Sequence, residues 1–124
     1  MVQRLPPRLQ PALFQRVLPW LFGALLLAVA TLSLLPTAYL PAQAFNLWDK
    51  AQHALGFAAL AVCGLLAYPH HAARVLVGLL LYGGTIELAQ AATGWRHGDW
   101  HDWLADALGL AAGAGVTGWL GRRG

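Results

Sequence analysis

Charged side chains are scarce in this sequence. Eight basic and five acidic residues make up 10% of its 124 residues, whereas ordinary soluble domains carry about 25%. Because 58% of the residues are hydrophobic, so short a chain has too little polar surface for a water-soluble domain. The basic residues are also dispersed among apolar runs, which argues against a nucleic-acid-binding face. The composition predicts one integral membrane bundle without a separate soluble domain.

Cysteine and serine each occur once, which limits the chemistry available to the chain. The single cysteine, Cys63, excludes an internal disulfide, and its apolar neighbours predict a small buried side chain. Ser33 lies in the first apolar run with no activating pattern for a nucleophile. No His-Glu-x-x-His motif and no phosphate-cradling glycine loop is present in the sequence. These absences favour a binding protein over an enzyme and leave the enzymatic alternative open.

Four apolar runs are each long enough to cross a bilayer, which takes about 20 helical residues. The sequence predicts an all-α, four-helix transmembrane bundle with helices at about 14–35, 48–68, 73–93 and 102–120. Short loops favour antiparallel neighbours. Residues 1–13 are expected to form a flexible N-terminal tail, and residues 14–120 a single membrane domain.

A cleaved signal peptide is the alternative interpretation of the first run. Ala42-Gln43-Ala44 imitates a cleavage site. However, the apolar stretch is longer than the usual core of about 7–15 residues, and the imitation site lies well beyond its end. A retained membrane helix is therefore the preferred prediction.

The distribution of basic residues predicts the orientation in the membrane. One side of the four predicted spans would hold Arg4, Arg8, Arg16, Arg74, Arg122 and Arg123. The other would hold only Lys50 and Arg96. This bias places both termini in the cytoplasm of a bacterial cell, with the protein multi-pass in the inner membrane. All five acidic residues then fall at the outer end.

Glu87 is the most informative acidic residue because it lies inside an apolar run. It precedes the outer end of its helix by about six residues, or about 9 Å. Facing lipid, a carboxylate at that depth would cost on the order of 2–3 kcal/mol, so it should face the bundle interior. Gln90 shares its face, and Arg96 is the expected counter-ion. This pair of Glu87 and Arg96 either has a functional role or only holds the helices in register.

Two further i, i+4 pairs place polar groups on helix faces that point inward. Asp49 and His53 share one face, and His53 could hydrogen-bond to Glu87 or Asp102. Asp102 shares its own face with Asp106. Because like charges one turn apart repel, either one aspartate is protonated or a cation lies between them.

Glycines continue the face of the two aspartates. Gly109 and Gly113 form a small-residue seam, which lets membrane helices pack closely. No metal site or other cofactor is predicted outright, although a divalent cation at the acidic residues is an open possibility. The residues expected to converge are named here the polar cluster: Asp49, Lys50, His53, Glu87, Gln90, Arg96, Asp99, Asp102 and Asp106.

The spacing of these residues resembles that of the VanZ-like family of small membrane proteins. The matching segments are Asp49-Lys50-x-x-His53-x-x-x-Phe57, Glu87-x-x-Gln90, Arg96, Asp102, Asp106, Gly109 and Gly113. They fall within residues 46–120. One departure is Asp106, where the family usually has asparagine, so a carboxylate replaces a neutral amide.

The resemblance implies four membrane helices and an outer polar cluster. Namesake members are associated with tolerance of the glycopeptide teicoplanin, whose target is a cell-wall precursor outside the membrane. The leading hypothesis is therefore an envelope protein whose polar cluster binds a lipid head group or a lipid-linked precursor. The alternative is an intramembrane enzyme with Glu87 or His53 as general base. Membrane lipids are the expected partners, nucleic acid is not, and a homo-oligomer is open.

Overall fold

The structure is a computed structural model that describes residues 12–36, 47–95 and 100–123, without the side chains of 47–49, 122 and 123. The described residues form four helices and no strand: α1 (Ala12–Leu34), α2 (Leu47–Ala67), α3 (Ala72–Thr93) and α4 (Trp100–Arg123). The all-α prediction is confirmed. Each of the first three helices begins and ends within two residues of its predicted bounds, and α4 ends three residues later than predicted.

The N-terminal boundary differs slightly from the prediction. Residues 1–11 of the predicted tail lie outside the described residues, whereas residues 12 and 13 already belong to α1. Three helical segments are long and apolar enough to cross a membrane: Ala12–Leu34, Lys50–Ala67 and Ala72–Thr93. They support a membrane protein. α4 is not among these candidate spans, and it carries two aspartates, two arginines and several glycines.

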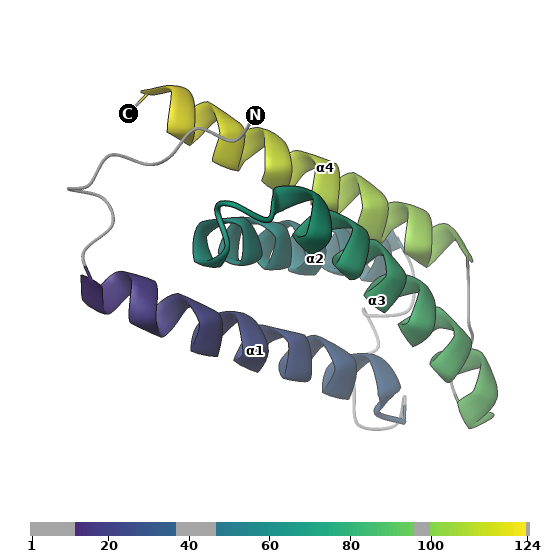
Figure 1. Ribbon diagram of the computed structural model, residues 1–124. Helices are drawn as coiled ribbons and strands as arrows, with labels where there is room; N and C mark the ends of the chain where they lie inside the picture. Colours follow the sequence, from purple (N-terminus) through teal and green to yellow (C-terminus); the bar gives the residue numbers. More distant parts are fainter. Residues whose placement is uncertain (1–11, 37–46, 96–99, 124) are drawn as a thin grey trace.

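Successive helices run in alternating directions (Figure 1). α2 turns into α3 at Pro69-His70, where the backbone N–H of His71 donates to the carbonyl of Tyr68 at 3.0 Å. α3 is capped by Gly94, whose φ of 80° is a left-handed conformation that favours glycine. The ends of α1 and α3 and the starts of α2 and α4 therefore lie at the same end of the bundle.

The most extensive helix contact joins α2 and α4, and glycine makes it possible. A Cβ on Gly109 would overlap the carbonyl oxygen of Ala54, and one on Gly113 would lie 2.6 Å from that of Ala58. The two helices thus approach backbone to backbone along the predicted seam, as small residues allow in membrane bundles.

The apolar core lies beside this seam. Its buried members are Phe57, Leu60, Ala61, Leu79 and Leu110, from α2, α3 and α4. Partly buried side chains of α1, including Phe22 and Val29, cover it from another side. The outer surface also remains apolar, with Leu27, Leu88 and Leu108 among the most exposed side chains. An apolar exterior around an apolar core is expected for a bundle whose solvent is lipid.

Candidate functional site: a polar cluster between three helices

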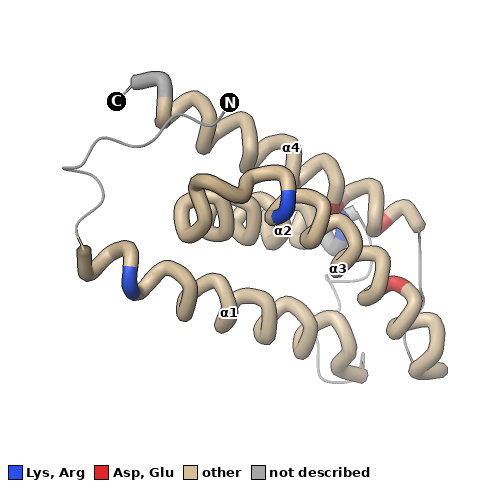
Figure 2. The backbone as a smooth tube through the Cα atoms, viewed as in Figure 1, with Lys and Arg blue, Asp and Glu red and all other residues tan. Residues whose placement is uncertain are grey.

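The acidic residues whose side chains are described lie in one half of the bundle, on α3 and α4 (Figure 2). This is the half in which α2 and α4 begin and α3 ends. Arg16 and Arg74, by contrast, lie in the first turns of α1 and α3, at the opposite end. As the sequence predicts, the described helices place Glu87, Asp102 and Asp106 at one end of the bundle and these two arginines at the other.

Lys50 and Asp102 join the starts of α2 and α4. The Lys50 ammonium lies 3.0 Å from Asp102 Oδ1 and donates a hydrogen bond to it. The Asp102 side chain is 8% exposed, whereas that of Lys50 is 38% exposed. Asp102 also lies in the first turn of α4, where the helix dipole favours a carboxylate. A half-exposed cation therefore borders a buried anion at the rim of the polar cluster.

His53 lies one turn further along α2 and pairs with Asp106 of α4. Its Nδ1 lies 2.9 Å from Asp106 Oδ1, and Asp106 is only 1% exposed. The sequence offers Glu87 and Asp102 as possible hydrogen-bond partners of His53 and does not single out Asp106. The close seam between α2 and α4 places Asp106 level with His53. The other ring nitrogen, Nε2, lies 4.0 Å from Asp102 Oδ2, beyond hydrogen-bond distance.

Gly83 of α3 provides the space that Asp106 occupies, and sequence reasoning missed it. A Cβ on Gly83 would lie 2.9 Å from Asp106 Oδ2 and 3.2 Å from the Phe57 ring. The available signal was the pair Gly83-Gly84 inside an otherwise apolar helix, where glycine is unfavourable without a packing reason.

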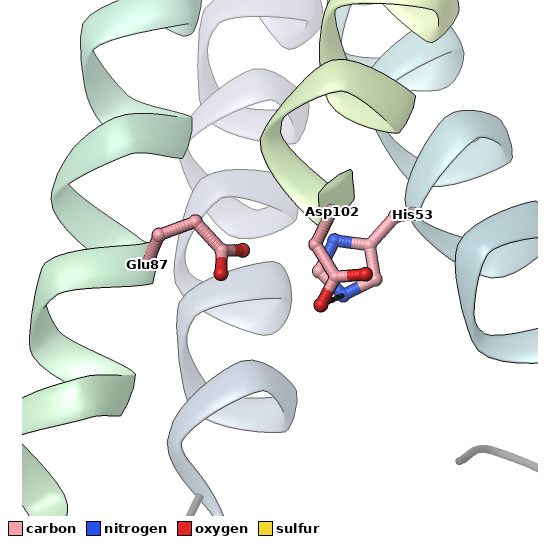
Figure 3. A group of neighbouring side chains, drawn as sticks. All are labelled: His53, Glu87 and Asp102. Atoms are coloured by element: carbon pink, nitrogen blue, oxygen red, sulfur yellow. Dashed lines mark ion pairs between the residues drawn. The ribbon is translucent and has the colours of Figure 1, made fainter. Parts of the chain in front are cut away.

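Glu87 faces the interior of the bundle, as its depth predicts. It is 8% exposed, and its carboxylate points from α3 toward Asp102 and His53 (Figure 3). One ligand-capable atom from each of these three residues lies within 4.8 Å of the others. Three helices therefore contribute one imidazole and two carboxylates to a small volume.

Gln90 extends the polar groups of α3 toward α1. Its side-chain amide donates a 2.8 Å hydrogen bond to the backbone carbonyl of Ser33, and Gln90 is 1% exposed. The indole N–H of Trp95 donates to the next carbonyl, that of Leu34, at 2.9 Å. α1 thus contributes backbone acceptors rather than side chains, which a sequence pattern does not reveal.

Three predicted members of the polar cluster cannot be placed. Arg96 and Asp99 lie outside the described residues, and so does the side chain of Asp49. The expected pair between Glu87 and Arg96 therefore stays a prediction. The six members whose side chains are described come from α2, α3 and α4: Lys50, His53, Glu87, Gln90, Asp102 and Asp106.

Comparisons with protein-family models, with curated proteins and with solved structures found no match to this chain. The resemblance to the VanZ-like family consequently remains an expectation from the spacing of residues. The geometry of the described side chains indicates what chemistry the polar cluster can perform. Buried carboxylates accept hydrogen bonds or bind cations, a half-exposed ammonium can meet an anion, and an imidazole held by a carboxylate can transfer a proton.

Proposed function

We propose that this chain is a multi-pass protein of the bacterial inner membrane that binds the polar head group of a lipid or lipid-linked cell-wall precursor. All four helices cross the bilayer in this proposal, with both termini in the cytoplasm. The observation that carries it is that four members of the polar cluster are buried in a bundle whose exterior is apolar: Glu87, Gln90, Asp102 and Asp106. Ionisable groups at membrane depth are costly and mark binding or transfer sites.

The exposed surface of α4 supports its place in the membrane. Leu108 and Val116 are 71% and 50% exposed on α4, whereas Asp102 and Asp106 of the same helix are buried. A helix that hides its acids and exposes its aliphatic side chains suits a lipid-facing position in a bundle. Its modest hydropathy then reflects the buried face rather than the surface that meets lipid.

The division of charge within the polar cluster indicates how a head group would bind. Lys50 is half-exposed at the rim and would meet a phosphate, together with Arg96 from the segment between α3 and α4. Glu87 and Asp102 are buried further in and would accept hydrogen bonds from hydroxyl or ammonium groups. A phosphate-bearing lipid with a hydroxyl or ammonium substituent would make both the phosphate contact and these hydrogen bonds.

Native mass spectrometry of the full chain, purified in mild detergent, tests this proposal. The wild type is expected to retain a phosphate-bearing lipid, and the double variant Lys50→Ala with Arg96→Ala to lose it. Arg74→Ala is the matched control, because Arg74 is an exposed cation at the other end of the bundle. Equal lipid retention by the double variant and the control would contradict the proposal.

Glycopeptide tolerance is the cellular outcome that the VanZ-like resemblance implies. Expression in a susceptible bacterium is expected to raise the teicoplanin concentration that inhibits growth, and Arg96→Ala to abolish that effect while insertion persists. Unchanged susceptibility on expression of the wild type would remove this part of the proposal without affecting lipid binding.

An intramembrane enzyme acting on lipid-linked substrates is the second candidate. The observation that favours it is the His53–Asp106 pair, since a carboxylate that orients an imidazole is a recurrent general-base arrangement. Turnover of a lipid-linked substrate by the purified protein, abolished in Glu87→Gln, would establish it. A loss of detergent stability in Glu87→Gln as large as the loss of function would indicate a purely structural clamp.

A further inference from the structure

Three potential metal ligands converge where α2, α3 and α4 meet (Figure 3). His53, Glu87 and Asp102 each offer one donor atom, and the three atoms lie within 4.8 Å of one another. Glu87 and Asp102 are buried, and the His53 side chain is 10% exposed. The donors come from three helices whose packing fixes their positions, so the arrangement does not depend on a mobile loop.

The orientation of His53 matches that of a metal-binding histidine. Asp106 Oδ1, at 2.9 Å, accepts a hydrogen bond from Nδ1–H when that nitrogen carries the proton. Nε2 then carries the lone pair and faces Asp102. Metal-bound histidines almost always donate their other N–H to a carboxylate or carbonyl, which fixes the tautomer and the ring. Gly83 leaves the space that lets Asp106 take this position.

Asp102 divides its two oxygens between different partners. Oδ1 meets Lys50 at 3.0 Å, whereas Oδ2 lies 4.0 Å from His53 Nε2. Two ligands of one tetrahedral zinc ion are about 3.4 Å apart, given metal–ligand distances near 2.1 Å. A contraction of about half an ångström therefore brings Oδ2 and Nε2 to coordinating positions, and the Lys50 contact can persist.

We propose that His53 Nε2, Glu87 and Asp102 bind a divalent first-row transition-metal cation, with Asp106 as the positioning residue for His53. One nitrogen and two carboxylate ligands suit Zn²⁺ or Mn²⁺ better than the all-oxygen sites typical of Mg²⁺ and Ca²⁺. Three protein ligands leave a coordination position for water or substrate, as in catalytic zinc sites. This inference does not require the proposed lipid binding.

Zn²⁺ titration of the chelator-treated, delipidated full chain in detergent tests the inference, with a metallochromic indicator as competitor. The wild type is expected to bind one Zn²⁺ per chain. His53→Ala is expected to weaken binding by at least about 100-fold, and Asp106→Ala by about 10–100-fold. Asp106→Asn should recover part of the loss, because its amide oxygen can still accept the Nδ1–H bond.

His71→Ala is the matched control, since His71 is an exposed histidine at the opposite end of the bundle and should leave affinity unchanged. Each variant's helicity and elution volume would be compared with those of the wild type. If a variant fails to fold, X-ray absorption spectroscopy of the Zn²⁺-loaded wild type tests the ligand set instead. We expect one imidazole and two carboxylates as zinc ligands.

Substoichiometric binding by the wild type would overturn the proposal. So would a His53→Ala variant with wild-type affinity, or a zinc ion whose spectrum shows two or more imidazoles. Lipid retention is a separate readout. A wild type that binds Zn²⁺ but retains no lipid would refute the proposed function alone, whereas lipid retention without Zn²⁺ binding would refute only the metal site.

Discussion

Replacing Gly109 with alanine tests the close approach of α2 and α4. The new Cβ would overlap the carbonyl oxygen of Ala54 and lie 2.9 Å and 3.0 Å from its C and Cα atoms. All three atoms belong to the backbone of α2, so no side-chain rotation can relieve the contact. The two helices must therefore move apart, and this also moves His53 of α2 away from Asp106 of α4.

The magnitude follows from the cost of overpacking a well-packed contact, which is typically about 1–3 kcal/mol. Because the contact is with backbone that cannot rotate away, the cost lies in the upper part of this range, about 2–3 kcal/mol, and alanine's better helix propensity offsets about 1 kcal/mol of it. For a chain of this length, each kcal/mol lowers the Tm by roughly 3–5 °C. Gly109→Ala is therefore expected to lower the Tm by roughly 3–10 °C.

Cys63 provides the assay. It is the only cysteine and is 6% exposed, so a thiol-reactive fluorophore should label it only when the bundle opens. Thermal scans in detergent would compare the wild type and Gly109→Ala. Gly115→Ala is the matched control on α4, because a Cβ at Gly115 would meet nothing within 4 Å. Its Tm should be unchanged or higher by up to roughly 3–5 °C.

A Gly109→Ala variant as stable as Gly115→Ala would refute the reasoning, because it would mean that α2 and α4 do not meet backbone to backbone. A fall in Tm for both variants would likewise contradict it, since glycine would then be needed along the whole helix. Gly113→Ala should resemble Gly109→Ala, because its Cβ would lie 2.6 Å from the carbonyl oxygen of Ala58.

Three further substitutions test the polar cluster by the same thermal scan. Gly83→Ala should lower the Tm because its Cβ would lie 2.9 Å from Asp106 Oδ2, and an unchanged Tm would place that carboxylate elsewhere. Gln90→Leu removes the hydrogen bond to the Ser33 carbonyl and should cost about 1 kcal/mol; a more stable variant would contradict that contact. Lys50→Ala should lower the Tm further at low than at high salt, since its half-exposed ion pair is screened by salt, and an equal loss at both would contradict this.

The four helices could be predicted because their causes are local. Three of the helices are long and apolar enough to cross a membrane, and Gly94 follows the end of α3 in the left-handed conformation that glycine favours. The i, i+4 spacing of Asp102 and Asp106 places both on one helix face, whatever the helix packs against. The bounds of α4 were predicted less closely, since it begins two residues earlier and ends three residues later than the apolar run indicates.

The sequence alone determined which residues of each helix are polar and that they share a face. The tertiary structure decided which of them meet. Spacing along one helix fixes directions relative to that helix only, so it could not identify Asp106 as a hydrogen-bond partner of His53. The pairing of His53 with Asp106 depends on how α2 and α4 are rotated and shifted relative to each other. The contact of Gly109 with Ala54 and the space beside Gly83 determine that arrangement, and both involve helices that are far apart in the chain.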